Sequence, residues 1–421
     1  MEENKIFLET QKQFIEIAEE LKLKSNLVEE LKEPNFLFKF QIPVLMDNGE
    51  VKIFMGFRSQ HNDVFGPYKG GIRFYEKVSS EEIKTLSMLM TWKCSLVGIP
   101  FGGSKGGVIV NPRNLSEKEL ERLSRGYVKK LFPLMGPHKD IPAPDMNTNS
   151  QIIAWMVDEY SKLKGEFSPA AFTGKSLNIK GLEGRTEATG YGGVVILEKL
   201  KEVLNLKPEK TTIAIQGFGN VGFHFAKFAF EKGYKIVALS EYKGGVCLKE
   251  GLNPEEVFKC RNQKDKIAGC YCSGSVCDIK EGKTITNEEL LETEVDVLVP
   301  AAVEDVIKAD NAVKIKAKYI IAMANHPITK EAQKILEERD IVVVPDILSN
   351  SGGVIASYFE WLQAIDEDSW EKQKTFNKLS KILGETFDRV WNLSKEKEIS
   401  LDKAAYLLAI SRVAKAIEKT R

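Results

Sequence analysis

The sequence has little of what marks a membrane protein or a nucleic-acid-binding protein. Its 421 residues contain no run approaching about 18 uncharged apolar residues, so we expect no membrane-spanning segment. Its 60 basic residues are matched by 60 acidic ones, which leaves no excess positive charge for binding phosphates or lipid headgroups. We therefore expect neither a nucleic-acid partner nor a membrane partner.

Cysteine and histidine are scarce. The N-terminal segment has no basic stretch followed by an apolar one, as a secretory signal would, so we expect a cytoplasmic protein with free thiols. Four of the six cysteines fall within one short segment, at Cys260, Cys270, Cys272 and Cys277. Their spacing lacks the Cys-x-x-Cys pairs of common zinc sites, so we expect ordinary thiols and no metal, with a metal or redox role as the alternative. The four histidines form no ligand pattern: His61, His138, His224 and His326.

What is present is typical of a globular α/β protein. Apolar residues make up 43% and charged residues 29% of the chain, and this length suggests two or three domains at roughly 150 residues each. The first part predicts helices over residues 1–33, then a hairpin over 36–58 around the turn Asp47-Asn48-Gly49. A helix is expected from the capping residue Ser79 to about Leu96. We interpret 66–74, 98–107 and 140–145 as loops, because they are rich in glycine or proline.

From about residue 187 apolar strands alternate with helices, which predicts a parallel sheet with crossover helices. Expected strands are 212–216, 235–240, 295–299, 319–322 and 341–344, and the chain from about Gly353 to its end reads as helical.

A dinucleotide-binding turn is predicted directly after the first of these strands. Gly217, Gly219 and Gly222 have the Gly-x-Gly-x-x-Gly spacing, with a strand before and a helix after, and Glu241 closes the next strand. The glycines would allow a tight turn and close approach of a pyrophosphate to the helix N-terminus. Glu241 would accept a hydrogen bond from a ribose hydroxyl, which favours NAD, whereas Lys243 could pair with the 2′-phosphate of NADP. A glycine-rich turn without a ligand is the structural alternative.

Three lysines lie in or beside the glycine-rich segments: Lys69, Lys93 and Lys105. We interpret them as converging on a small anion. Burial and neighbouring cations would lower the pKa of such a lysine, so that it could act as a general base. Asp145 is the candidate proton-shuttling partner. Unrelated surface lysines are the alternative, which spacing alone does not exclude.

These motifs together resemble the glutamate dehydrogenases of the amino-acid dehydrogenase superfamily. The matching segments span nearly the whole chain. They include Gly66-Pro-Tyr-Lys-Gly-Gly-Ile-Arg-Phe74, Thr91-Trp-Lys93, Gly102-Gly-Ser-Lys-Gly-Gly107, Pro142-Ala-Pro-Asp145, Arg185-Thr-Glu-Ala-Thr-Gly-Tyr-Gly192, Gly217-Phe-Gly-Asn-Val-Gly222, Val299-Pro-Ala-Ala302 and Asn350-Ser-Gly-Gly-Val-Ile-Ala-Ser-Tyr-Phe-Glu360.

The resemblance implies a role for each matching residue. Lys105 would activate the water that attacks the iminium, and Asp145 would exchange protons with the amino group. Lys93 would pair with the α-carboxylate beside Met90, while Lys69 and Ser357 would hold the side-chain carboxylate in a pocket lined by Ala143 and Val354. The implied cofactor contacts, besides the three glycines and Glu241, are Arg185, Thr189, Asn220, Val221, Ala301, Asn325 and Asn350.

Lys69 and Ser357 distinguish the substrate class. The related leucine, valine and phenylalanine dehydrogenases have apolar residues at these two places, and an apolar substrate would leave a cation and a hydroxyl unpaired here. The resemblance therefore implies reversible, NAD-dependent (NADP possible) oxidative deamination of L-glutamate to 2-oxoglutarate and ammonium. The alternatives are a dehydrogenase of apolar amino acids and a catalytically silent NAD-binding regulatory protein.

The resemblance also predicts the architecture. We expect an α/β substrate-binding and oligomerisation domain, residues 1–186 plus 396–421, and a Rossmann-type dinucleotide-binding domain, residues 187–395, with a cleft between them. A homohexamer is implied. The chain departs from the family pattern at His326, at Ala364 (where the family usually has asparagine) and in the cysteine-bearing segment 260–277.

Overall fold

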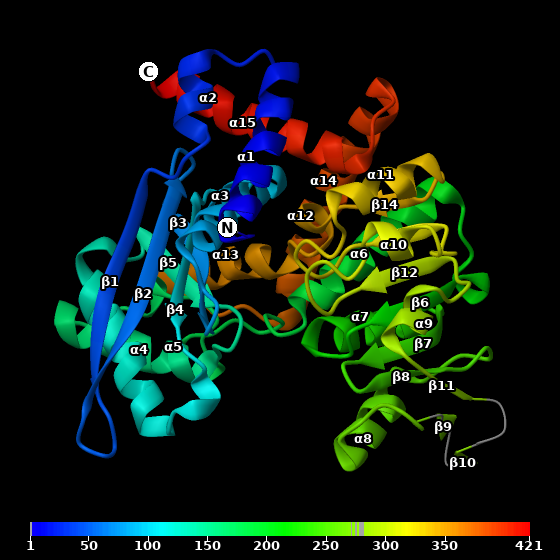
Figure 1. Cartoon of the computed structure of the whole chain (residues 1–421), viewed down its shortest axis with the longest axis horizontal. Coiled ribbons are helices and arrows are strands. Elements are labelled where there is room, and N and C mark those ends of the chain that lie inside the picture. The colour runs from blue at the N-terminus through cyan, green and yellow to red at the C-terminus, as the bar shows by residue number, and fades with distance from the viewer. Residues whose placement is uncertain (1, 271, 274–275, 278–281) are drawn as a thin grey trace. The chain divides into compact units, whose positions relative to one another are not determined.

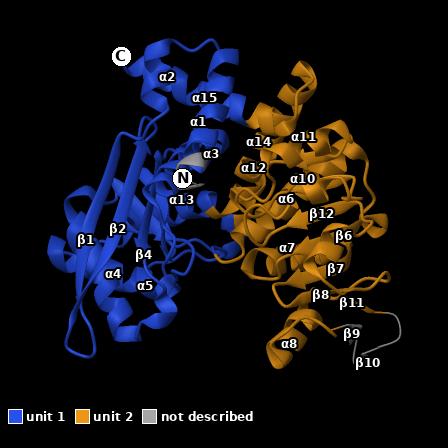
Figure 2. Cartoon of the chain, viewed as in Figure 1, with its two compact units in different colours: residues 1–185, 354–375, 406–421 blue, residues 186–353, 376–405 orange. Residues whose placement is uncertain are grey.

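The computed structural model describes residues 2–270, 272–273, 276–277 and 282–421. The chain divides into two compact units (Figure 2). Unit 1 contains residues 1–185, 354–375 and 406–421, and unit 2 contains residues 186–353 and 376–405. These units differ from the predicted domains in two segments: 354–375 groups with unit 1, and 396–405 groups with unit 2.

Unit 1 is built on a five-stranded sheet of order β1-β2-β4-β3-β5. Its strands are β1 (Phe36–Leu45), β2 (Val51–Asn62), β3 (Tyr68–Tyr75), β4 (Gly103–Ile109) and β5 (Asp140–Pro144). Its helices are α1 (Glu2–Glu20), α2 (Ser25–Leu31), α3 (Ser80–Val97), α4 (Glu117–Leu131), α5 (Ser150–Lys164), α13 (Gly352–Ile365) and α15 (Leu401–Thr420), the last two of which begin within unit 2.

The β1–β2 hairpin and helix α3 form as the sequence predicts. Gly49 supplies the positive φ of the hairpin turn, and β1 pairs antiparallel with β2 along its length (Figure 1). The Ser79 hydroxyl accepts a hydrogen bond from the Glu82 N–H, which caps α3, and Gly98 ends the helix in the left-handed conformation.

The three segments interpreted as loops are instead largely strands. Residues 66–74, 98–107 and 140–145 supply β3, β4 and β5, and β3 runs parallel to both β4 and β5. Glycine is needed here for close packing: a Cβ on Gly70 would lie 1.5 Å from the Ser104 carbonyl oxygen. The glycines therefore allow neighbouring strands to approach, where we expected them to open a loop.

Opposite faces of the unit 1 sheet have different characters. One face packs against α4 and α5 through an apolar core that includes Ile72, Phe74 and Val108 (Figure 1). Because side chains alternate along a strand, the side chains of Lys69 and Arg73 of β3 point to the other face. The alternation thus separates the hydrophobic core from the charged side chains.

Unit 2 contains the predicted parallel sheet, extended by two antiparallel strands. The strand order is β11-β8-β7-β6-β12-β13-β14. The parallel strands are β6 (Thr212–Gln216), β7 (Lys235–Glu241), β12 (Val297–Pro300), β13 (Tyr319–Ile321) and β14 (Val342–Val344), and the antiparallel ones are β8 (Gly244–Cys247) and β11 (Lys283–Ile285). A separate short pair is β9 (Cys272–Ser273) with β10 (Val276–Cys277).

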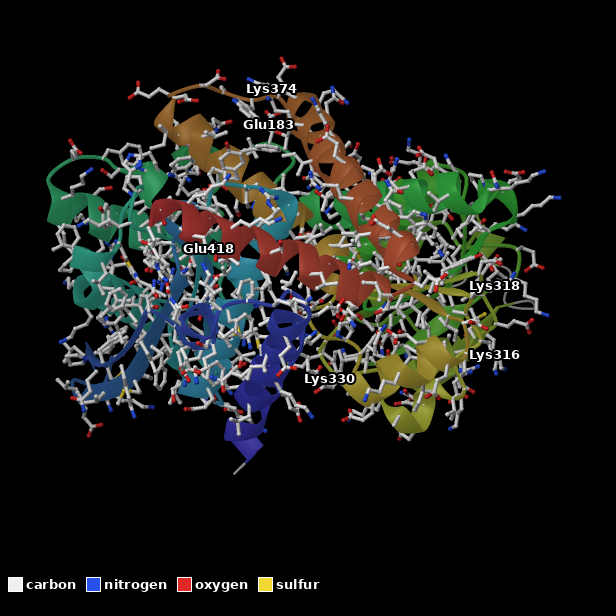
Figure 3. The ribbon with its side chains drawn as sticks, turned by 90° about the horizontal axis from the view of Figure 1, so that it is seen from above. Glu183, Lys316, Lys318, Lys330, Lys374 and Glu418 are labelled. Carbon is white, nitrogen blue, oxygen red and sulfur yellow. A yellow bond between two sulfur atoms is a disulfide. The ribbon has the colours of Figure 1, made fainter. Side chains whose placement is uncertain are left out.

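Helices surround this sheet. They are α6 (Ala188–Leu204), α7 (Asn220–Glu231), α8 (Pro254–Lys264), α9 (Asn287–Leu291), α10 (Ala309–Ala312), α11 (Lys330–Glu338) and α12 (Asp346–Ser349), together with most of α14 (Lys372–Lys397) and the start of α15 (Leu401–Thr420). The sheet interior is apolar, with Ala214, Leu298 and Ile320 fully buried. Lys316 and Lys318 are exposed on unit 2 (Figure 3), and the Lys318 Nζ pairs with Asp296. No helix in the described residues is long and apolar enough to cross a membrane.

Candidate active site

Strands β3, β4 and β5 bring the predicted catalytic pair together in unit 1. Lys105 lies within β4 and Asp145 directly follows β5, with β3 between the two strands. A Cβ on Gly71 of β3 would lie 2.7 Å from the Asp145 Cβ. Glycine at this position therefore lets Asp145 lie against the middle strand.

Lys105 and Asp145 form a buried ion pair. The Lys105 Nζ lies 3.1 Å from Asp145 Oδ1, and only 5% of Lys105 is exposed. Burial lowers the pKa of Lys105, with Arg73 and Lys93 acting in the same direction, while Asp145 partly opposes them. A lysine in this environment loses its proton more readily than an exposed one, as a general base requires.

Arg73 is the second cation on Asp145. Its Nε donates a 2.8 Å hydrogen bond to Asp145 Oδ2, and its Nη1 donates to Glu82. Burial opposes ionisation of Asp145, but Lys105 and Arg73 outweigh it and hold the pKa of this carboxyl well below its usual range. Asp145 is therefore an ionised hydrogen-bond acceptor at neutral pH.

Lys69 is buried without a counter-ion. It is 2% exposed, and its Nζ donates to the Ile141 carbonyl oxygen at 3.1 Å. Burial, together with the nearby Arg185 and Arg58 guanidinium groups, lowers its pKa to about 7. In the described part of the chain Lys69 makes no ion pair. An anionic ligand would supply the negative counter-charge that the protein does not place beside this lysine.

Arg185 contributes a second unsatisfied cation beside Lys69. Its buried Nε has no hydrogen-bond partner among the described residues, and burial lowers its pKa. The sequence placed Arg185 with the cofactor contacts, whereas the structure places it in unit 1, close enough to Lys69 to affect its pKa. A buried donor left unpaired is costly, which favours an anionic ligand at this point.

Helix α13 brings further predicted residues to unit 1. Ser357 is buried, and Val354 at the start of the unit 1 segment is half-buried. Glu360, one turn after Ser357, is near enough to Lys69 to influence its pKa. Its carboxylate accepts hydrogen bonds from the Gly174 and Lys175 N–H groups and pairs with the Lys175 Nζ at 2.7 Å. This buried pair fixes the helix that carries Ser357.

Helix α3 supplies the third lysine. Lys93 acts on the pKa of Lys105, and Lys93 and Lys69 both act on the pKa of Cys94, so the three lysines lie in one region. Met90 precedes Lys93 by about one turn and is half-buried, and Ala143 of β5 is buried. The structure thus assembles the lysines and Asp145 in unit 1.

A buried network that the sequence did not reveal supports these strands. Arg58 of β2 pairs with Asp140 of β5 through Nε, at 2.9 Å from Oδ2, and through Nη2. Asp140 also accepts hydrogen bonds from Gln60 and Ser104, and Arg58 donates to the Gly70 carbonyl oxygen. This network connects the strands that carry Lys69 and Lys105.

Arg73 was also missed, although a signal was present. It follows Lys69 by four residues within one quoted motif. A strand interpretation would have placed Lys69 and Arg73 on one face by their even spacing, but the glycines led us to expect a loop. Arg58 and Asp140 had no such signal, because they are 82 residues apart.

In unit 2 the glycine motif forms a tight turn between β6 and α7. Gly217 has a φ of +94°, and a Cβ on Gly222 would lie 1.8 Å from the Gly217 carbonyl oxygen. Helix α7 begins at Asn220, and Gly219 at its N-cap offers no side chain to its N–H groups. A Cβ on Gly219 would meet nothing within 4 Å, so the space before the helix is open on this side. These features fit a pyrophosphate at the helix N-terminus.

The other predicted dinucleotide contacts in unit 2 lie around this turn. Glu241, Gly217, Ala301 and Asn325 come at or after the carboxyl ends of the adjacent strands β7, β6, β12 and β13, respectively. This is the edge at which such sheets bind ligands. Asn220 donates to the Thr186 carbonyl oxygen, near Thr189 in the first turn of α6. Asn350 donates to Asn325 Oδ1 at 3.0 Å. Val221 lies in the first turn of α7.

Glu241 is held by a neighbouring segment. Its Oε2 accepts from the Arg261 Nε at 2.9 Å, and its Oε1 accepts from the Ile267 N–H at 3.1 Å. Lys243 pairs with Asp265 at 2.6 Å. Both charged groups that bear on the choice between NAD and NADP are thus bound by residues 261–267.

The prediction of free thiols is wrong for two of the six cysteines. Cys260 and Cys270 form a disulfide, whereas Cys94 and Cys247 are free. The side chains of the other two cysteines of the expected cluster, Cys272 and Cys277, lie outside the described residues. Among the described residues, no group of three or more histidine, cysteine or acidic side chains could hold a metal ion.

Comparison with known protein families gives matches over both parts of the chain. The model described as Glutamate/Leucine/Phenylalanine/Valine dehydrogenase matches residues 181–421. The model for the dimerisation domain of Glu/Leu/Phe/Val dehydrogenases matches residues 34–162.

Several relatives are similar over nearly their full length. The glutamate dehydrogenase of Thermotoga maritima is 43% identical over 100% of this chain and 99% of its own. The NADP-specific glutamate dehydrogenase of Synechocystis is 40% identical over 98% and 96%. The catabolic NAD-specific glutamate dehydrogenase of Bacillus subtilis is 42% identical over 98% and 95%.

Solved structures agree with these matches. The hetero-hexameric glutamate dehydrogenase of Thermus thermophilus, in a leucine-bound form, has a TM-score of 0.90 at 32% identity and covers 99% of this chain and 96% of its own. The glutamate dehydrogenase of Peptoniphilus asaccharolyticus has a TM-score of 0.86 at 37% identity and covers 99% of both chains.

Proposed function

The chain belongs to the glutamate/leucine/phenylalanine/valine dehydrogenase family, and from this premise we propose that it catalyses reversible oxidative deamination of L-glutamate to 2-oxoglutarate and ammonium. In this proposal unit 1 binds the amino acid and unit 2 binds the nicotinamide dinucleotide. The contact between Lys105 and Asp145 carries the proposal, because it joins a lysine of lowered pKa to an ionised carboxylate.

The substrate preference rests on Lys69. This buried lysine lies near Arg185, and neither side chain has a carboxylate bonded to it in the described residues. The side-chain carboxylate of glutamate would pair with Lys69 and accept a hydrogen bond from Ser357. Leucine would leave a buried cation uncompensated, at a cost that a polar site imposes on apolar ligands. Glutamate is therefore favoured over apolar amino acids.

The chemistry is assigned to the pair on β4 and β5. A nicotinamide dinucleotide held by the glycine turn of unit 2 would supply the acceptor for the hydride from Cα of the substrate. Lys93 holds the α-carboxylate, and Met90, Ala143 and Val354 line the pocket. Lys105 takes a proton from the water that attacks the substrate iminium, because its lowered pKa makes it a base near neutral pH. Asp145, 3.1 Å away, exchanges protons with the amino group and stabilises Lys105 whenever the lysine is charged.

We propose NAD as the preferred cofactor. The glycine turn fits a dinucleotide, and Glu241 is an ionisable acceptor at the place where a ribose hydroxyl binds. A carboxylate there would repel a 2′-phosphate, and Lys243 is already paired with Asp265. The relatives include both NAD-specific and NADP-specific enzymes, so the preference follows from Glu241 in this chain.

We propose that the assembly is a homohexamer. Strand β1 lies at the edge of the unit 1 sheet, and the β1–β2 hairpin exposes Leu45, Val51 and Ile53. An edge strand with exposed apolar side chains is suited to pairing with another chain.

The deciding experiment measures initial rates of nicotinamide reduction with glutamate and with leucine, each with NAD and with NADP. Glutamate turnover with NAD supports the whole assignment. Glutamate turnover with NADP alone would retain the chemistry and overturn the role of Glu241. Preference for leucine would overturn the role of Lys69 and Ser357.

A second measurement separates an enzyme from a silent NAD-binding protein. Lys105→Ala is expected to lose glutamate turnover and to keep NAD binding. Unchanged turnover would remove Lys105 from the mechanism.

A further inference from the structure

The segment that binds Glu241 is closed by a disulfide. We call residues 260–270, joined at their ends by the Cys260–Cys270 bond, the disulfide loop. The loop begins in the last part of α8, and Asp265 at the C-cap of that helix has a left-handed backbone. Within this ring lie three residues that bind side chains at or just after the end of β7: Arg261 and Ile267 contact Glu241, and Asp265 contacts Lys243.

The disulfide loop holds Glu241 more firmly than it holds Lys243. The Glu241 side chain is 11% exposed, and each of its oxygens accepts one hydrogen bond from the loop. A carboxylate oxygen has room for a further hydrogen bond, so Glu241 can still accept from a ribose hydroxyl. Because both oxygens are engaged by the loop, the orientation of the carboxylate depends on where Arg261 and Ile267 are held.

The contact between the disulfide loop and Lys243 also favours NAD over NADP. Its Nζ donates to Asp265 at both a side-chain oxygen and the backbone carbonyl oxygen, at 2.6 and 2.9 Å. Asp265 is highly exposed, so the ion pair itself contributes little. Because one of the two acceptors is the backbone carbonyl oxygen of Asp265, the position of the Lys243 Nζ depends on the conformation of the disulfide loop. While the loop is closed, Lys243 is directed to Asp265 and away from a 2′-phosphate.

From this geometry we infer that the disulfide loop sets the cofactor preference, and that opening the Cys260–Cys270 bond weakens discrimination between NAD and NADP. The inference rests on the proposed dinucleotide site in unit 2. Arg261 acts as a positioning residue through Glu241, and the disulfide restricts the loop that carries Arg261 and Ile267. A linked ring of this length has far fewer conformations than an open segment.

The redox step is thiol–disulfide exchange with a dithiol. One thiolate of the dithiol attacks a loop sulfur, forms a mixed disulfide and releases the other loop cysteine as a thiolate. The second thiolate of the dithiol then attacks the dithiol sulfur of the mixed disulfide and releases the remaining loop cysteine. The Cys260–Cys270 bond breaks and two thiols form. The two electrons come from the dithiol, which becomes a disulfide. Both cysteines are buried, so exchange requires local opening of the loop and is expected to be slow.

The first experiment establishes the bond in the full-length protein. Protein isolated without reductant is treated with a thiol-blocking reagent, digested and analysed by mass spectrometry. A peptide pair joined through Cys260 and Cys270 is expected. Its absence overturns the inference.

The second experiment measures binding, independent of turnover. ADP-ribose and 2′-phospho-ADP-ribose are titrated calorimetrically against the disulfide form, the dithiol-reduced form and the double variant Cys260→Ser/Cys270→Ser. The affinity ratio in favour of ADP-ribose is expected to fall about tenfold in the latter two, equivalent to about 1.4 kcal/mol. An unchanged ratio in either form overturns the inference.

Matched variants identify the cause. Cys247→Ser removes a free thiol outside the loop, so its response to reduction should equal that of the unmodified chain. Arg261→Gln leaves the disulfide intact and should lower the affinity ratio in favour of ADP-ribose, as reduction of the disulfide does. Arg261→Lys should recover part of this ratio. If the double cysteine variant does not fold, Arg261→Gln still decides, because an unchanged ratio removes the link from the loop to Glu241.

The outcomes separate this inference from the proposed function. Absence of glutamate turnover together with a redox-dependent ratio would overturn the function and retain the loop. Turnover with a redox-independent ratio would retain the function and overturn the loop. Failure of ADP-ribose to bind any form would remove both the dinucleotide site and the inference.

Discussion

At the scale of single residues, the buried cations of unit 1 determine how the protein responds to pH. Lys69 has a pKa lowered to about 7 by burial, with Arg185 and Arg58 adding to the effect. Lys105 also has a lowered pKa. Such groups bind fewer protons in the folded state than in the unfolded state, so each makes folding less favourable as pH falls through the range between its two pKa values. A bound anion reverses this by favouring the charged lysine.

Lys69→Met is therefore expected to stabilise the free protein and to impair substrate binding. For Lys69 the affected window runs from about 7 up to the ordinary lysine value of 10.5: stability is gained as pH rises through it and is lacking below it. The variant should raise the unfolding midpoint at pH near 7 by about a few degrees, measured by scanning calorimetry, and raise KM for glutamate at least about tenfold.

The unmodified chain at a pH about one unit above the pKa of Lys69 should take up nearly one proton as 2-oxoglutarate binds, because the lysine must be charged to pair. Calorimetric titration in buffers of different ionisation enthalpy measures this uptake, and Lys69→Met should lack it. A lower unfolding midpoint in the variant would contradict the assignment of an uncompensated buried lysine.

Arg73 is expected to control the ionisation of Asp145 without touching the substrate. Arg73→Met removes one of the two cations that keep the pKa of Asp145 low, so this pKa should rise toward its ordinary range. The pH profile of kcat should then lose activity on its acidic side, by about tenfold at one pH unit below the ordinary carboxyl value of 3.8, relative to pH 8. Arg73→Lys should restore part of the loss. A uniform reduction at every pH would indicate a merely structural role.

At the scale of elements, β3, β4 and β5 are strands that local sequence patterns do not predict. Their glycines and prolines are depleted in ordinary strands, which favoured loops over 66–74, 98–107 and 140–145. What makes them strands is tertiary: Arg58 and Asp140 pair across the sheet, and Gly70 accommodates the Ser104 carbonyl group. By contrast, the strands of unit 2 are apolar runs whose burial could be predicted directly, and β6, β7 and the glycine turn form where expected.

The same reasoning applies to the candidate site. The lysines and Asp145 were identified from glycine context and family resemblance, and the structure brings them together. Arg58 and Glu360 act through partners distant in sequence. A pattern of local spacing carries no information on such pairs.

Gly71→Ala tests whether the middle strand positions Asp145. The added Cβ would lie 2.7 Å from the Asp145 Cβ, so the carboxylate must shift and its contact with Lys105 should weaken. We expect kcat to fall by about 100-fold, as misplacement of a catalytic group by about 1 Å can do, measured by steady-state kinetics with folding verified by circular dichroism.

Gly384→Ala is the matched control. Gly384 lies in helix α14, where a new Cβ would meet only an ordinary contact at 3.8 Å. It should leave kcat unchanged and stabilise the protein by about 0.5–1 kcal/mol. A normal kcat in Gly71→Ala would mean that Asp145 can shift without loss of function.

At the scale of the whole molecule, the exposed end of the β1–β2 hairpin bears on assembly. Leu45→Glu with Ile53→Glu introduces charges where apolar side chains are exposed, and burial of unpaired charge in an interface is costly. Analytical ultracentrifugation should show smaller species than the hexamer.

Val313→Glu changes an exposed apolar residue of unit 2 and should leave the assembly intact. An unchanged hexamer in the hairpin variant would place the subunit contacts elsewhere.

The path of the chain between the two units has a consequence for dissecting the protein genetically. The chain passes from one unit to the other after residues 185, 353, 375 and 405. A gene cut after codon 353 would encode every strand of both sheets, yet its product would lack Ser357 and would leave Lys175 without the carboxylate of Glu360. Neither unit can therefore be cloned as one uninterrupted reading frame, and exchanging cofactor modules between homologous genes requires several crossover points.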